Sequence, residues 1–268
     1  MFLADCHTHS LCSPDSEAPM VEMARRGVEL GLNTLCLTDH CDLMSIYGEP
    51  TPDYDWGTVL EQRRETLDAF GTQLDLPMGV ELGSGFYYPE AAAKIIAQPG
   101  LDFIIGSAHN LSPQAGGRDF FLLDYGTVED CYRALDDYFQ SMLSLAAAGE
   151  FYDVVGHIIY PLRYMKGRYP TPPDIWRYRD QIHEILRRAV ERGKGIEINT
   201  WKGQTLSAWR PVLKLYKDLG GEIITVGSDA HAPAPLALGI REAYQLMEDC
   251  GFRYVAVYHQ RKPEMIKL

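Results

Sequence analysis

Six of the eight histidines in this chain come at the ends of short apolar runs. They are His7, His9, His40, His109, His157 and His231. Two carboxylates, Glu81 and Asp229, occupy the same kind of position. Imidazole nitrogens and carboxylate oxygens are the groups that bind zinc, manganese and iron in proteins. The pattern therefore predicts a cluster of divalent metal ions and a metal-dependent hydrolase.

Two pairs of these residues have a spacing that suits chelation. His7 and His9 are separated by one residue, as are Asp229 and His231. In an extended segment, side chains two positions apart leave the same face, so each pair presents two ligands together. Burying so many titratable groups without a metal would cost on the order of kilocalories per mole for each group. The burial expected at these strand ends therefore favours bound metal.

The elements that carry these residues give them a common location. Seven apolar runs have the length of buried strands, and several are rich in valine and isoleucine. The predicted strands are Phe2–Cys6, Thr34–Leu37, Met78–Leu82, Phe103–Gly106, Val154–Gly156, Gly195–Ile198 and Ile223–Val226, with a further one over Tyr254–Tyr258. The predicted helices are Ala18–Gly31, Trp56–Phe70, Glu90–Ala97, Val128–Ala148, Asp174–Arg192, Ala208–Leu219 and Leu236–Cys250. This alternation favours an α/β fold, either a β/α barrel or a doubly wound parallel sheet.

In a parallel β/α barrel, the C-terminal ends of all strands meet at one mouth, and active sites are built there. The predicted ligands follow strands in this way, so side chains up to about 200 positions apart are expected to converge. His183 lies inside a predicted helix and His259 near the end of the chain. We expect both of these histidines to be structural.

Charge and composition exclude several classes of partner. The chain has 268 residues and a net charge of −12, which disfavours polynucleotides and anionic membranes. No segment approaches the ~20 apolar residues of a membrane span, and the first ten residues do not resemble a signal peptide. The six cysteines form no CxxC pair, so we expect reduced thiols in a cytoplasmic protein.

The ordered motifs resemble those of the polymerase-and-histidinol-phosphatase (PHP) family over nearly the whole chain. The motifs are His7-Thr8-His9, Asp15, Thr38-Asp39-His40, Glu81, Ser107-Ala108-His109, Gly156-His157 and Ser228-Asp229-Ala230-His231. The resemblance implies a distorted (β/α)7 barrel, one domain over residues 1–268, and a trinuclear metal centre at the C-terminal ends of the strands. It also implies three divalent ions, which would be zinc, manganese or iron.

The resemblance assigns ligands by position. They are His7, His9, Glu81 and Asp229 for the first ion, Glu81 as a bridge with His109 and His157 for the second, and Asp15, His40 and His231 for the third. Several family members have a histidine where this chain has Asp15, and a hard oxygen ligand shifts preference toward manganese or iron. An alternative for Asp15 is a turn or helix-capping residue. Asp39 need not be a ligand and could orient a histidine.

Within the family, the chain is most similar to stand-alone histidinol-phosphate phosphatases. This similarity implies hydrolysis of L-histidinol phosphate, a small phosphorylated substrate, in histidine biosynthesis. Paired metals ~3.5–4 Å apart would provide an activated hydroxide that attacks phosphorus. The expected catalytic side chains are Asp229, His231 and Arg163, with Asp229 or His231 helping to protonate the leaving alcohol.

Four polar side chains are expected to contact the phosphate. They are Arg163, Lys202, Asn199 and Arg118, each in or after a loop that follows a predicted strand. Arg163 is favoured because its position matches a basic residue in similar phosphatases. The long loops 41–55 and 110–126 are expected to cover the substrate. Their aromatic residues would pack on a substrate ring or on one another, and their acidic residues would suit a cationic amine.

Three other functions stay open on the sequence alone. A phosphoesterase of the same family could act on a mononucleotide or another small phosphate ester. A metal-dependent amidohydrolase also uses a His-x-His after its first strand, although it typically needs a metal-bridging lysine or another ligand order. A module that only stores metal is disfavoured, because it needs no long substrate-sized loops. The sequence does not determine the oligomeric state.

Overall fold

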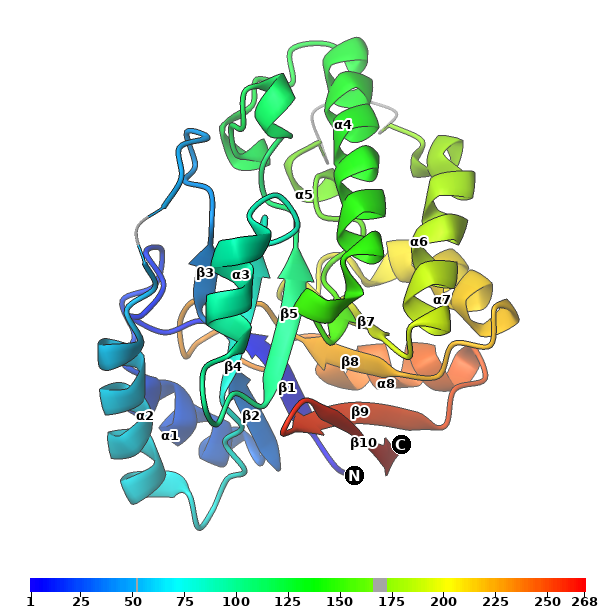
Figure 1. Ribbon diagram of the computed structural model, residues 1–268. Coiled ribbons are helices and arrows are strands. Elements are labelled where there is room, and N and C mark those ends of the chain that lie inside the picture. The colour runs from blue at the N-terminus through cyan, green and yellow to red at the C-terminus, as the bar shows by residue number, and fades with distance from the viewer. Residues whose placement is uncertain (52, 166–172) are drawn as a thin grey trace.

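Strands and helices alternate along the chain in a computed structural model that describes residues 1–51, 53–165 and 173–268 (Figure 1). The strands are β1 Ala4–Thr8, β2 Thr34–Leu37, β3 His40–Asp42, β4 Gly79–Gly83, β5 Phe103–Ser107, β6 Val154–Val155, β7 Gly195–Asn199, β8 Ile224–Gly227, β9 Tyr254–His259 and β10 Lys262–Lys267. The helices are α1 Met20–Leu30, α2 Trp56–Phe70, α3 Pro89–Ile96, α4 Val128–Ala147, α5 Leu162–Met165, α6 Arg179–Glu191, α7 Trp209–Asp218 and α8 Ile240–Asp249. The predicted α/β class is confirmed.

The central strands are parallel. Strands β3 to β8 form one six-stranded sheet in chain order, and β1 pairs with β2. A parallel bridge joins Thr8 at the end of β1 to Ala230 just after β8, and another joins Leu37 in β2 to Met78 just before β4. Backbone pairings therefore run from β1 to β2, on through β4 to β8, and back to β1.

The strands follow the predicted pattern because they are buried on both faces. Every residue of β1, β2 and β4 to β8 is buried, as expected for parallel strands covered by helices. The sequence did not predict β3, which has only three residues, including His40 and Asp42. It also did not predict β10, whose residues are mostly exposed and include Pro263. Neither segment contains the apolar run that marks a buried strand.

The helices that the sequence predicts are present, and they differ from the predictions mainly in the residues at which they begin and end. Helix α8 begins at Ile240 rather than Leu236, because Gly239 adopts a left-handed φ of 83° directly before it. The segment predicted as Asp174–Arg192 starts as a short 3₁₀ turn over Ile175–Tyr178 and becomes α6 only at Arg179. Among the described residues, no helix combines the length and the apolar character that crossing a membrane requires.

Strands β9 and β10 form an antiparallel hairpin on one side of the parallel strands (Figure 1). Tyr258 of β9 stacks on Phe103 at the start of β5, with ring centroids 4.9 Å apart. His259 pairs with Asp75, which precedes β4, at 3.1 Å, and with Glu264 of β10 at 3.2 Å. The hairpin therefore packs near the N-terminal ends of the strands, and the C-terminal ends stay available for a site.

Candidate metal centre

Glu81, in the middle of β4, is the carboxylate around which the candidate site is arranged. Its Oε1 lies 2.7 Å from His157 Nε2 and 3.0 Å from His109 Nε2. Its Oε2 lies 3.1 Å from His40 Nδ1 and 3.2 Å from His7 Nε2. Glu81 is only 1% exposed, and each imidazole comes from or just after a different strand. Each carboxylate oxygen thus serves its own pair of histidines, which is the geometry of a bridging ligand.

A second group of ligand atoms forms where β1 meets β8. His7 Nε2 and His9 Nε2 are 3.1 Å apart, and Asp229 Oδ1 lies 3.3 Å from His9 Nε2. Asp229 has a left-handed φ of 58°, and its backbone amide donates to the carbonyl oxygen of His7 at 2.9 Å. The pairing of the first and last central strands therefore places a His-x-His segment against an Asp-x-His segment.

A third group lies nearer the surface. Asp15 is in a turn after β1, and its Oδ2 lies 2.9 Å from His231 Nε2 and 3.7 Å from His40 Nε2. The His9 ring stacks on both His40 and His231, with centroids 4.2 and 4.1 Å away. The side chain of Asp15 is about half exposed, so it is the most open of the predicted ligands. All nine predicted ligand residues therefore lie in one connected cluster.

The donor atoms fit divalent metals. Four triplets have ligand atoms within 4.8 Å of one another: His7, His9 and Asp229; His9, His40 and His231; His40, Asp42 and His109; and Glu81, His109 and His157. Zinc bound tetrahedrally at 2.0–2.1 Å requires neighbouring nitrogens roughly 3.3 Å apart. The Nε2 atoms of His7 and His9 are 3.1 Å apart, and those of His109 and His157 are 3.2 Å apart. Two buried imidazole nitrogens facing each other at this distance are suited to a shared cation.

Carboxylates behind the cluster fix two of the rings. Glu197 is fully buried, and its Oε1 lies 2.6 Å from His7 Nδ1, while its Oε2 accepts from the backbone amide of His157 at 2.9 Å. Asp42 Oδ1 lies 2.8 Å from His109 Nδ1. A carboxylate on one ring nitrogen fixes the tautomer and aims the other nitrogen at a metal. The sequence analysis missed Glu197, although a charged residue inside an apolar strand was a signal.

Among the described residues, the hydrogen bonds of Asp39 connect it to a histidine through a serine. Its carboxylate accepts from the Ser10 backbone amide at 2.6 Å and from Ser13 Oγ at 2.7 Å. Ser13 Oγ in turn lies 3.1 Å from His9 Nδ1 and accepts from the backbone amide of His40 at 3.0 Å. Ser13 therefore orients two predicted ligands, and nothing in its sequence context indicated this.

The electrostatics of the cluster favour cation binding. Burial would raise the pKa of Glu81 and of Asp229, but the surrounding histidines hold both values well below the usual range. Burial would lower the pKa of His7, but Glu197, Glu81 and Asp229 together raise it well above 6.5. Burial and the charge of neighbouring histidines instead lower the pKa of His9 to about 3. The carboxylates are thus anionic at neutral pH, and bound metal would displace the protons that the histidines carry.

Two predicted phosphate contacts meet at Asp229. Arg163 Nη1 and Asn199 Nδ2 both donate to Asp229 Oδ2 at 2.9 Å. The Arg163 guanidinium also lies over two aromatic rings, 4.6 Å from the centroid of Tyr160 and 3.9 Å from that of Trp201. The side chain is only 5% exposed, so a full positive charge is buried beside the candidate metal ligands.

The other two predicted phosphate contacts differ in their surroundings. Lys202 is half-buried, and its Nζ lies 4.3 Å from the centroid of the Trp201 ring, near Arg163. Arg118 is exposed and donates to the carbonyl oxygen of Leu122 at 3.5 Å. No contact within the described part of the chain joins Arg118 to a candidate ligand. The structure therefore brings Lys202 to the site and leaves Arg118 outside it.

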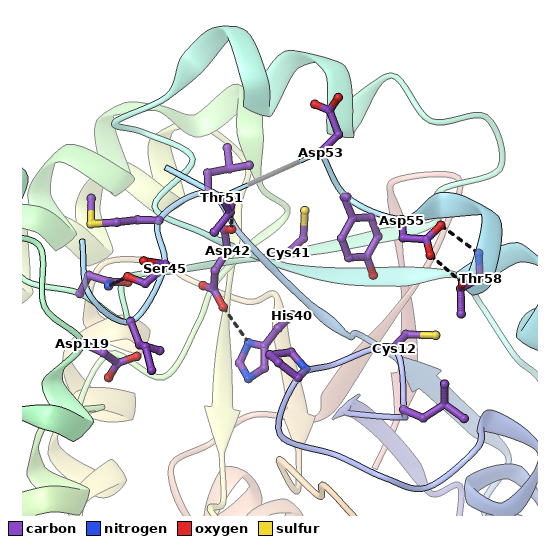
Figure 2. A pocket seen from close by; sticks show the side chains of 17 residues that line it. Cys12, His40, Cys41, Asp42, Ser45, Thr51, Asp53, Asp55, Thr58 and Asp119 are labelled. Carbon is purple, nitrogen blue, oxygen red and sulfur yellow. Dashed lines mark hydrogen bonds and ion pairs between the residues drawn. The ribbon is translucent and has the colours of Figure 1, made fainter. Parts of the chain in front are cut away.

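A cavity of about 550 Å³ opens beside His40 (Figure 2). Its apolar lining includes Leu11, Pro14, Leu43, Met44, Ile46 and Tyr54. Four carboxylates also line it: Asp42, Asp53, Asp55 and Asp119. No lysine or arginine is among its described lining residues. The cavity thus combines an apolar wall with negative charge directly at the metal-ligand cluster.

The two long loops contact each other at this cavity. Asn110 Nδ2 donates to the carbonyl oxygen of Ser45 at 2.8 Å, and the Asp119 amide donates to that of Ile46 at 3.0 Å. The five aromatic residues of these loops differ in burial and in whether they line the cavity. Tyr54 lines the cavity, Phe120 and Tyr125 are buried in the core, and Tyr47 and Phe121 are exposed. Most of these aromatics therefore do not line the cavity, and Tyr54 is the one placed to meet a ligand.

Comparisons with known proteins agree with this geometry. A protein of Clostridium acetobutylicum named as a probable histidinol-phosphatase is 29% identical over 94% of this chain and 95% of its own length. One of Thermotoga maritima with the same name is 27% identical over 95% of each chain. The crystal structure of histidinol phosphate phosphatase from Lactococcus lactis, complexed with zinc, L-histidinol and phosphate, has a TM-score of 0.83 at 26% identity and covers 98% of both chains. The family model described as the PHP domain matches residues 5–201, and the chain belongs to the PHP family.

Proposed function

We propose that this protein is a metal-dependent L-histidinol-phosphate phosphatase. The observation that carries the proposal is the convergence of four imidazoles on the buried carboxylate of Glu81, next to the ion pair of Arg163 and Asp229. Metal ions stabilise the negative charge of a phosphate monoester and activate water, and an arginine binds its oxygens through paired hydrogen bonds. The names of the curated relatives and the ligands bound in the Lactococcus lactis structure support the same reaction.

We infer that the parallel strands form a distorted (β/α)7 barrel and that residues 1–268 are one domain. The support is the continuous series of pairings that starts at β1 and returns to it from β8. In such a barrel the ligands would surround the C-terminal mouth. This placement agrees with the position of the β9–β10 hairpin near the N-terminal strand ends.

The proposed centre holds three divalent ions. Their ligands are His7, His9, Glu81 and Asp229; Glu81, His109 and His157; and Asp15, His40 and His231. Zinc is supported by the Lactococcus lactis relative, while manganese and iron stay possible occupants. When bound, such ions supply neutralisation of phosphoryl charge and activation of water.

The chain's own side chains supply the remaining steps. Arg163 and Lys202 bind the phosphoryl oxygens, because Arg163 is held beside Asp229 and Lys202 contacts the same Trp201 ring as Arg163. Asn199 holds the carboxylate of Asp229 in place through its amide.

Asp229 and His231 are the predicted proton donors for the leaving alcohol. His231 suits this role better, because its side chain is 16% exposed and that of Asp229 only 5%. Despite burial, neighbouring cations also hold the pKa of Asp229 well below its usual range, so its carboxylate is anionic.

The cavity beside His40 is suited to the leaving group. Histidinol carries an ammonium group and an imidazole ring, so it needs negative charge and a flat apolar wall. Asp119 and Asp53 provide carboxylates (Figure 2). Tyr54 provides a ring. Burial raises the pKa of Asp119, and a bound ammonium would favour its ionised form. The cavity volume lies within the range of ~300–1,000 Å³ that is usual for small ligands.

A metal analysis followed by a phosphate-release screen tests the proposal. The purified protein is loaded with zinc, manganese or iron and given histidinol phosphate, mononucleotides and sugar phosphates. We expect two or more metals per chain and the highest kcat/KM on histidinol phosphate. A preference for a mononucleotide would instead identify another phosphoesterase of the family. Fewer than two bound metals, with no phosphate released in any metal, would refute the proposal.

A further inference from the structure

Trp201 contacts two cations at once. Arg163 Cζ lies 3.9 Å from the centroid of its indole ring, and Lys202 Nζ lies 4.3 Å from it. Aromatic faces attract cations, and tryptophan does so most strongly. Both cations are predicted phosphate contacts, and Arg163 is bound to Asp229. The indole ring therefore contacts both Arg163 and Lys202.

We propose that Trp201 is a positioning residue whose ring holds Arg163 and Lys202 together as a clamp for the phosphoryl group. The proposal rests on the proposed phosphatase function, since it names how that site binds phosphate. Lysine and arginine side chains each have many rotamers, and fixing them costs entropy when phosphate binds. A rigid aromatic ring would reduce that cost, because it holds both cations before the substrate arrives.

The backbone around Trp201 is specialised for this placement. Trp201 has a φ of 44° and Lys202 a φ of 56°, both in the left-handed region that residues other than glycine seldom adopt. The Trp201 amide donates to Asn199 Oδ1 at 2.8 Å, and the Lys202 amide donates to the carbonyl oxygen of Ser228 at 2.9 Å. A turn with this backbone strain is stable only when contacts with the surrounding structure hold it in place. Backbone strain of this kind is concentrated at functional sites. Here the turn is tied to the residue before Asp229.

Arg163 also has a buried hydrogen-bond donor, its Nε, that could bind a substrate oxygen. Its Nη1 is bound to Asp229, but its buried Nε has no hydrogen-bond partner among the described residues. A buried donor without a partner is costly, so such groups normally meet an acceptor or a ligand. A phosphoryl oxygen is the acceptor that this reaction brings, and guanidinium groups bind phosphate through paired donors. Trp201 would keep the guanidinium plane oriented for that contact.

Substitutions of Trp201 test the proposal through phosphate binding. The metal-loaded enzyme is titrated with inorganic phosphate by calorimetry, and kcat, KM and metal content are measured in parallel. We expect Trp201→Leu to raise the Kd for phosphate about tenfold with unchanged metal content, and Trp201→Phe to recover most of the affinity. Trp176→Leu serves as a matched control, because Trp176 is also half-buried but lies on the 3₁₀ turn before α6.

A double variant shows whether the indole acts through the cations. Arg163→Lys alone should weaken phosphate binding, and adding Trp201→Leu should weaken it by less than in the wild type. Fully additive losses would overturn the proposal. So would wild-type phosphate affinity in Trp201→Leu, or loss of metal in that variant, which would assign the indole to Asp229 rather than to the cations. If the wild type binds phosphate but does not hydrolyse histidinol phosphate, the proposed function fails while the clamp stands.

Discussion

The carboxylate of Glu197 supports two parts of the candidate metal centre without being one of the predicted ligands. One of its oxygens lies 2.6 Å from His7 Nδ1, and the other accepts from the backbone amide of His157. It therefore fixes a ligand on β1 and the loop that carries a ligand after β6. Its own negative charge also helps to raise the pKa of His7. A neutral side chain of the same shape would retain contacts but not that charge.

Glu197→Gln is expected to weaken metal binding by roughly 10- to 100-fold, because the His7 ring would lose its charged partner. The measurement is competition for zinc against a chelator of known affinity. Glu61→Gln on the exposed side of α2 is the matched control and should bind zinc as the wild type does. Unchanged zinc affinity in Glu197→Gln would show that Glu197 only packs against the ring.

Asp119→Asn is expected to change substrate preference rather than phosphate chemistry. Asp119 lines the cavity beside His40, and its replacement removes one negative charge facing a cationic leaving group. We expect kcat/KM for histidinol phosphate to fall roughly tenfold, the loss of about one charge-assisted hydrogen bond. The value for p-nitrophenyl phosphate, whose leaving group carries no amine, should hardly change. An equal loss on both esters would contradict a role in recognition of the amine.

At the residue scale, the sequence indicates candidate ligands more readily than the side chains that support them. Eight of the nine predicted ligands could be named because their types and their positions at strand ends are both visible in the sequence, while Asp15 was named from the resemblance to the PHP family. Ser13, Asp42 and Glu197 could not be assigned to particular rings, because such assignments depend on distances between strands. Arg118 fails to reach the ligands because its loop turns it toward Leu122, a geometry that no local pattern encodes.

At the scale of elements, the contact between β1 and β8 requires glycine at position 227, because a side chain there would collide with His7. A Cβ on Gly227 would lie 2.2 Å from His7 Cβ and 3.0 Å from Glu197 Oε1. Gly227 has no positive φ, so the requirement here is for space rather than for a special backbone conformation. The close approach of β8 to β1 is what brings the two chelating segments together.

Gly227→Ala is therefore expected to lower the free energy of unfolding by about 1–3 kcal/mol and to weaken zinc binding. Denaturant unfolding and zinc competition measure the two effects. Gly126→Ala is the control, because a Cβ there would meet its nearest atom at an ordinary 3.6 Å. If Gly227→Ala matched the wild type in both assays, the strands would have room that the structure does not show.

The β9–β10 hairpin carries a pH-dependent contact away from the metals. Burial alone would lower the pKa of His259, but its hydrogen bond to Asp75 and the charges of Asp75 and Glu264 raise it above 6.5. A raised histidine pKa gives stability that is fully present below about pH 6.5 and lost as pH rises through the folded value. The contribution is small, several tenths of a kcal/mol, because the side chain is about one-third exposed.

We expect His259→Gln to be less stable than the wild type at pH 6 and closer to it at pH 9. Urea unfolding of both proteins at the two pH values gives the difference, and titration of the metal ligands cancels because both proteins contain them. A difference that grows with pH would contradict the sign of the shift. The order of strands could be predicted from apolar runs, but this hairpin could not, since β10 is mostly exposed.

At the scale of the whole molecule, the metals would act as cross-links between distant parts of the chain. The candidate ligand groups include residues in or after β1, β3, β4, β5, β6 and β8. A ligand that binds only the folded state adds about 4 kcal/mol of stability when its concentration is a thousand times its Kd. Binding would also offset part of the net charge of −12.

Removing the metals with a chelator is expected to lower the Tm by roughly 10 °C, given a few degrees for each kcal/mol in a domain of this size. Differential scanning calorimetry of the metal-loaded and stripped protein measures the change. Adding zinc back should restore the original Tm, which distinguishes metal loss from damage. An unchanged Tm after verified removal of metal would mean that the strands hold the site together without cations.

The return of the last central strand to the first has a consequence for how the protein is made. Asp229 and His231 are synthesised roughly 220 residues after His7 and His9, which takes about ten to forty seconds at common rates of synthesis. Until then β1 lacks β8, and the two chelating segments cannot meet. The complete set of candidate ligands therefore exists only after β8 and the segment that follows it have been synthesised, so a metal ion that needs all of them would bind after that point.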